Sequence, residues 1–86
     1  MKILFHGDVR EKVLGENSVD VGDVESVRAV IELLDARFGD GIKEFLLGEN
    51  TCFFLVNGKG VMTTGGLDTP LRPGDKVEVL SYVSGG

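Results

Sequence analysis

Two segments near opposite ends of the chain are rich in apolar residues, and successive side chains would point to opposite sides if each segment forms a β-strand. The segments are Lys2–Phe5 and Lys76–Tyr82, and a period of two residues is typical of a β-strand with one buried face. On the side that we expect to face the core are Ile3, Phe5, Val77 and Val79. On the opposite side are Leu4, His6, Glu78 and Leu80.

A longer period marks the middle of the chain. Apolar residues at intervals of three and four predict an amphipathic helix, and they are Val27, Val30, Ile31, Leu34 and Phe38. Ser26 stands before them as a suitable N-cap, and Gly39 stands where such a helix commonly ends. We expect a second, shorter helix over Ile42–Leu47.

Shorter segments complete the pattern. Residues 8–14 predict a helical turn, and Ser18–Val21 predicts a strand that forms a hairpin with the first one. Thr51–Asn57 predicts a third strand, whose unbroken apolar run indicates that both of its faces are covered at least in part. Asn57-Gly58 is a hairpin signal, and we expect a short strand to begin at Val61. This order predicts one α+β domain, with a helix on one face of a mixed sheet.

Composition indicates a soluble globular protein, with 42% hydrophobic and 27% charged residues. No segment approaches the roughly 20 apolar residues that span a bilayer, and the first residues lack the apolar region of a signal peptide. We therefore expect a cytoplasmic protein without a membrane partner. The single cysteine, Cys52, fits that compartment and excludes an internal disulfide.

The formal net charge of −5 makes nucleic acid an unfavourable ligand, because phosphate groups are repelled. Two readings of this charge remain open: acidic patches that steer basic protein partners, or solubility alone. His6 has no Cys or carboxylate at metal-ligand spacing, so we expect no metal site there, and Cys52 fits an inert core position. Residues 57–60 are rich in glycine but precede no helix, which argues against a phosphate loop.

The C-terminal third carries the most specific signal. A turn at Pro70–Asp75 leads into the last strand, and the sequence ends in Val83-Ser84-Gly85-Gly86. Together with the opening Lys2–Phe5 and the Val56-Asn57-Gly58 turn, these residues resemble the molybdopterin synthase small subunit, a ubiquitin-like sulfur carrier of the MoaD/ThiS type. The resemblance spans nearly the whole chain. One departure is Ser81-Tyr82, where the family often has two prolines, so we expect a less stiff tail.

The resemblance implies a ubiquitin-like β-grasp fold, with a mixed sheet of four to five strands and one main helix packed on one face. The first and last strands would lie side by side and run parallel. The globular domain would cover residues 1–83, and residues 84–86 would form a flexible tail.

The resemblance also implies an activity that depends on the carboxylate of Gly86. An E1-like enzyme would adenylate it with ATP and Mg, and a sulfur donor enzyme would convert the adenylate to a thiocarboxylate. The molybdopterin synthase large subunit would then receive the sulfur for the molybdenum or tungsten cofactor. The domain itself would bind no cofactor and would not be an enzyme, because catalysis would lie in its partners.

We expect Val83, Ser84 and Gly85 to thread into a partner, since glycine lets two backbones approach closely. An apolar docking patch on the outer sheet face would hold the partner, and it comprises Leu4, His6, Leu80 and Tyr82. Three alternatives remain: a ThiS-like carrier for thiamine or tRNA thiolation, a ubiquitin-like protein modifier, and a β-grasp interaction module whose terminal glycines do no chemistry.

Overall fold

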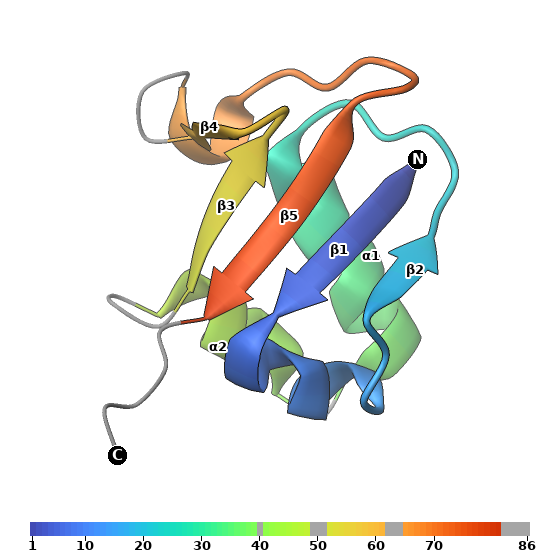
Figure 1. Cartoon of the computed structure of the whole chain (residues 1–86), viewed down its shortest axis with the longest axis vertical. Coiled ribbons are helices and arrows are strands. Elements are labelled where there is room, and N and C mark those ends of the chain that lie inside the picture. Colours follow the sequence, from blue (N-terminus) through green and yellow to red (C-terminus); the bar gives the residue numbers. More distant parts are fainter. Residues whose placement is uncertain (40, 49–51, 62–64, 82–86) are drawn as a thin grey trace.

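One five-stranded sheet organises the molecule, with strand order β2-β1-β5-β3-β4 (Figure 1). The computed structural model describes residues 1–39, 41–48, 52–61 and 65–81. The strands are β1 (Lys2–His6), β2 (Ser18–Asp20), β3 (Cys52–Val56), β4 (Lys59–Gly60) and β5 (Lys76–Ser81). The central pair, β1 and β5, runs parallel, whereas the other neighbouring strands are antiparallel. The predicted mixed sheet is confirmed.

Two helices cover one face of this sheet (Figure 1). α1 (Val27–Phe38) begins as predicted, because the Ser26 hydroxyl accepts a hydrogen bond of 3.2 Å from the backbone N–H of Ala29. Gly39 ends the helix at φ 60°, a conformation that glycine adopts readily. The second helix, α2, spans Ile42–Leu47, also as predicted.

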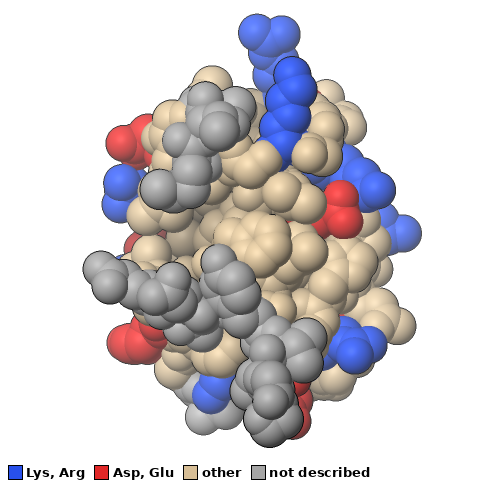
Figure 2. Space-filling view, turned by 60° about the vertical axis from the view of Figure 1, so that its left-hand side comes forward, with Lys and Arg blue, Asp and Glu red and all other residues tan. Residues whose placement is uncertain are grey.

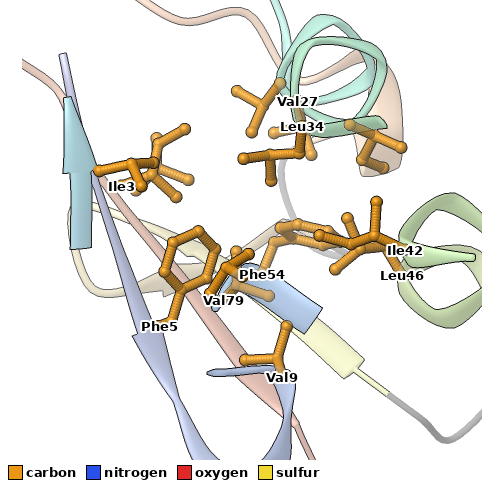
Figure 3. Close-up of a cluster of buried hydrophobic side chains, with 14 of the residues drawn as sticks. Ile3, Phe5, Val9, Val27, Leu34, Ile42, Leu46, Phe54 and Val79 are labelled. Atoms are coloured by element: carbon orange, nitrogen blue, oxygen red, sulfur yellow. The ribbon is translucent and has the colours of Figure 1, made fainter. Parts of the chain in front are cut away.

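The core lies between the sheet and these helices (Figure 3). The four inward residues of the two central strands are at most 2% exposed, and they are Ile3, Phe5, Val77 and Val79. From the helices, Val27, Leu34, Ile42 and Leu46 complete the cluster. The two-residue alternation of the outer segments therefore predicted the buried face of each central strand correctly.

Two local features differ from expectation. The helical turn predicted after β1 is confirmed as a 3₁₀ helix, Gly7–Val13, whereas a second short 3₁₀ helix at Gly66–Asp68 was not predicted. The fourth strand begins at Lys59 rather than at Val61. Asn57 and Gly58 both take positive φ and form a two-residue turn, so the chain pairs again with β3 directly after it.

Candidate functional site

The outer face of the sheet, which lies away from the helices, has an apolar centre. We define the docking face as six outward side chains on the three strands β1, β3 and β5. They are Leu4, His6, Phe53, Leu55, Glu78 and Leu80. The strand register places Leu80 between His6 and Phe53, and Glu78 between Leu4 and Leu55. Phe53 is 37% exposed, and it lies beside the partly exposed apolar side chains Leu55 and Leu80. Figure 2 shows the molecule from the β3 side, with an uncharged surface at its centre.

One polar pair crosses this apolar centre. His6 Nε2 lies 3.0 Å from Glu78 Oε2, and the Lys76 Nζ atom lies 3.6 Å from the other oxygen of Glu78. The Glu78 side chain is only 18% exposed, so its carboxylate is held in place by neighbouring groups. His6 therefore contributes a side-chain contact between β1 and β5. Within the described ranges, no three His, Cys, Asp or Glu side chains gather into a metal-binding group.

Ser81, at the C-terminal end of β5, forms hydrogen bonds with residues near the N-terminus of the chain. The Ser81 hydroxyl accepts a hydrogen bond of 3.0 Å from the buried backbone N–H of Val9 and donates one of 3.3 Å to the His6 carbonyl oxygen. Gly7, at φ 86°, lies against it, and a Cβ atom there would come within 2.5 Å of the Ser81 hydroxyl oxygen. Two hydrogen bonds thus fix Ser81, the last described residue of β5.

The opposite end of β5 is held by a turn between β3 and β5. The Asn57 side chain donates to Asp75 and accepts the backbone N–H of Lys76, at 3.0 and 2.9 Å. The backbone N–H of Arg72 donates to the second oxygen of Asp75 at 2.8 Å. The hydrogen bond from Asn57 has the larger effect and that from the Arg72 backbone the smaller. Both stabilise the ionised carboxylate and lower the pKa of Asp75. Side-chain hydrogen bonds therefore hold both ends of β5, the strand that leads to the C-terminal residues.

Cys52 begins β3, pairs with Ser81 across the strands, and packs against the core. Burial raises the pKa of the Cys52 thiol to about 11, because the anion would lose hydration. The protonated thiol that results is a poor nucleophile at neutral pH, which agrees with the inert role expected for it.

Leu4, His6 and Leu80 share one face, as predicted from the alternation of the two end segments. Phe53 and Leu55 belong to the same face but were not predicted, because the run from Cys52 to Val56 is apolar throughout. The remaining predicted site residues lie outside the described residues: Tyr82, Val83, Ser84, Gly85 and Gly86. The boundary between domain and tail at residues 83 and 84 stays a prediction for the same reason. Among the described residues, no helix has the length and apolar character needed to cross a membrane.

Known proteins are similar to this chain in both sequence and fold. A protein of Archaeoglobus fulgidus, provisionally assigned as a sulfur carrier, is 34% identical over 79 residues, which cover 80% of this chain and 90% of that protein. Mycobacterium tuberculosis CysO superposes with a TM-score of 0.82 at 28% identity, covering 95% of this chain and 98% of that one. CysO of Amycolatopsis orientalis, solved in a complex with BexX, has the same TM-score and identity and covers 99% and 98% of the two chains.

A third solved structure has a name that refers to molybdopterin. It is a protein of Pyrococcus furiosus, provisionally assigned as molybdopterin converting factor subunit 1, with a TM-score of 0.71, 26% identity and 95% of both chains covered. The predicted ubiquitin-like β-grasp fold and the MoaD/ThiS resemblance are thus confirmed. The family model described as the ThiS family matches residues 3–86. This chain therefore belongs to the ThiS family of ubiquitin-like sulfur carriers.

Proposed function

We propose that this chain carries sulfur as a thiocarboxylate on Gly86 and donates it, as small subunit of molybdopterin synthase, for the molybdenum or tungsten cofactor. One structural observation supports this beyond family membership. The docking face includes side chains of β5, the strand that ends at the anchored Ser81, five residues before Gly86. A partner that binds the docking face is therefore close to Ser81, the last described residue before the five residues that end at Gly86.

The proposed chemistry starts from an unreactive group. A terminal carboxylate has a pKa of roughly 3.3–3.7, so it is ionised at neutral pH and repels nucleophiles. An E1-like partner would use MgATP to form the acyl-adenylate, which releases pyrophosphate. Hydrosulfide released by a donor enzyme would then attack the carbonyl carbon, AMP would leave, and loss of a proton would give the thiocarboxylate. This chain would supply the carboxylate and its delivery, while the catalytic side chains would belong to the partners.

Docking of the globular body would offset the cost of ordering the tail. Fixing the backbone of one residue costs about 1–2 kcal/mol, so threading Val83–Gly86 into a narrow site is unfavourable on its own. Burial of Leu4, Leu80, Phe53 and Leu55 against a partner would supply apolar contact area. Tyr82 stays a predicted member of this contact.

The similarity to the Pyrococcus furiosus protein, whose name refers to molybdopterin, supports a pterin acceptor, whereas the match to the ThiS family favours a ThiS-like carrier for thiamine or tRNA thiolation. Reconstitution separates the two. We expect the purified thiocarboxylate form to convert a precursor pterin to the dithiolene in the presence of a molybdopterin synthase large subunit. Sulfur transfer to a thiazole precursor or to tRNA, without pterin conversion, would establish the second function.

Mass spectrometry of the protein isolated from its natural host tests the carrier proposal itself. We expect a C-terminal peptide that ends at Gly86 with one oxygen replaced by sulfur. Deletion of Gly86 should abolish sulfur transfer and leave the unfolding midpoint unchanged, whereas Ser84→Ala, which keeps the main-chain length, should retain transfer. Detection of Gly86 joined to lysines of other proteins would support a modifier, and full transfer by the deletion variant would refute the carrier proposal.

A further inference from the structure

Basic side chains border one end of the docking face, although the chain as a whole is acidic. Lys2 and Lys76 lie side by side where β1 and β5 begin, with Lys59 on β4 and Arg72 in the adjoining turn. We call these four residues the basic margin. Figure 2 shows Lys and Arg side chains above and to the right of the uncharged centre. The formal net charge of −5 must therefore come mainly from other surfaces of the protein.

The acidic residues near the basic margin are already engaged. Asp75 accepts hydrogen bonds from Asn57 and from the backbone of Arg72, and Glu78 interacts with His6 and Lys76. By contrast, Lys2, Lys59 and Arg72 are exposed, and their side chains form no ion pair with another described residue. Three cationic side chains are thus available to a partner beside an apolar surface.

A groove of about 490 Å³ opens within the basic margin, between the turn after β3 and the segment that precedes β5. Lys59 and Arg72 line it together with Val56, Asn57, Thr69, Pro70 and Asp75, whose carboxylate already accepts the hydrogen bonds from Asn57 and Arg72. Two cations and one carboxylate leave this lining with a net positive charge, and that charge favours a short segment that carries carboxylates. It lies at the opposite end of β5 from Ser81, which at about 3.3 Å per residue is roughly 17 Å away.

We propose that the docking face selects a partner protein whose contact surface is apolar at its centre and acidic where it meets the basic margin, with an acidic segment in the groove. This inference rests on the proposed function for its claim that the partner is the enzyme that acts on the tail. A standard interface buries about 800 Å² on each partner, so one contact can extend from the groove to Ser81. At an ionic strength of 0.15 M the Debye length is about 8 Å, so the local cations outweigh the distant acidic surfaces.

Association kinetics with the E1-like adenylating enzyme of the same organism test this inference. We expect Lys2→Glu combined with Arg72→Glu to slow association at least about tenfold at low salt, and to remove most of the salt dependence seen for the wild type. The matched control is Arg28→Glu combined with Lys43→Glu, which changes the net charge equally on the helix side and should slow association less than about threefold. Equal slowing by both pairs, or faster association of the first, would overturn the proposal.

Two further measurements keep the inference separate from the proposed function. Absence of ATP–pyrophosphate exchange with the wild-type chain would refute adenylation of Gly86 and would leave the charge test intact. An NMR titration with a synthetic peptide of Glu, Leu and Phe then tests the surface alone, with a peptide of Lys, Leu and Phe as control. We expect the acidic peptide to shift the amide signals of Lys2, Lys59 and Lys76, and tighter binding of the basic peptide at these residues would refute the inference.

Discussion

The two faces of the same sheet serve different purposes. On the face toward the helices, Ile3, Phe5, Val77 and Val79 are at most 2% exposed, and they hold the domain together. On the opposite face, residues of the same strands keep part of their surface in water, and Phe53 is 37% exposed. A single step along β5, from Val79 to Leu80, moves a side chain from one environment to the other.

This difference shows how a small domain can present an apolar surface without losing its fold. The core is complete without the outer face, because α1 and α2 cover only one side of the sheet (Figure 1). The outer apolar residues are therefore available for a partner, and the polar pair His6–Glu78 interrupts their surface. Contacts on the inner face should control the free energy of unfolding, and contacts on the outer face should control binding.

Val79→Asp should have the largest effect on stability. Val79 is 0% exposed, and the new carboxylate would be buried without a partner, at a cost of several kcal/mol. Since domains are stable by only about 5–15 kcal/mol, we expect a largely unfolded chain by circular dichroism and NMR. Val79→Ala is the milder control, with an expected loss of about 1–3 kcal/mol in denaturant titrations. A folded Val79→Asp variant with native stability would contradict the assignment of the inner face.

Ser81→Ala should have the next largest effect. The substitution leaves the buried N–H of Val9 without its hydrogen-bond acceptor, which costs about 1–3 kcal/mol of unfolding free energy. We expect Ser81→Thr, which keeps the hydroxyl, to lose less unfolding free energy than Ser81→Ala. Amide hydrogen exchange at Val9 provides a local measurement and should accelerate in Ser81→Ala. Unchanged exchange at Val9 would show that the hydroxyl does not hold the end of β5.

The sequence predicted the faces of β1 and β5 because successive side chains of a strand point to opposite sides, and polar residues such as His6 and Glu78 mark the side away from the core. It did not predict that Phe53 and Leu55 join the docking face, since the run from Cys52 to Val56 is apolar throughout and carries no sign of which side is covered. That information depends on how many helices pack on the sheet, which is a property of the whole fold.

Local sequence patterns also could not predict the hydrogen bonds of Ser81. Its hydrogen-bond partners lie 72 and 75 residues away in the chain, and only the parallel pairing of β1 with β5 brings them together. The basic margin was hidden for a similar reason. Lys2, Lys59, Arg72 and Lys76 come from separate segments, and the net charge of −5 gives no indication of where they meet.

Asp75→Asn should have a smaller, pH-dependent effect. The pKa of Asp75 is lower in the native state than its ordinary value of 3.8, so its ionised form stabilises the fold. That contribution is present above pH 3.8 and is lost as the pH falls through the native pKa. We expect the difference in unfolding free energy between wild type and Asp75→Asn to shrink as the pH falls from 6 to 2, in denaturant titrations. A difference that stays constant over this range would contradict the assigned hydrogen bonds.

Leu80→Asp should have the smallest effect on stability and a large effect on binding. Leu80 points outward between His6 and Phe53, so a carboxylate there remains in contact with water. We expect the unfolding free energy to fall by about 1 kcal/mol or less, in contrast to the unfolding expected for Val79→Asp. Binding to the adenylating enzyme, measured by calorimetry, should weaken at least tenfold, because the carboxylate would be desolvated in the apolar centre of the interface. Loss of folding would place Leu80 in the core, and unchanged affinity would remove the outer face from the contact with that enzyme.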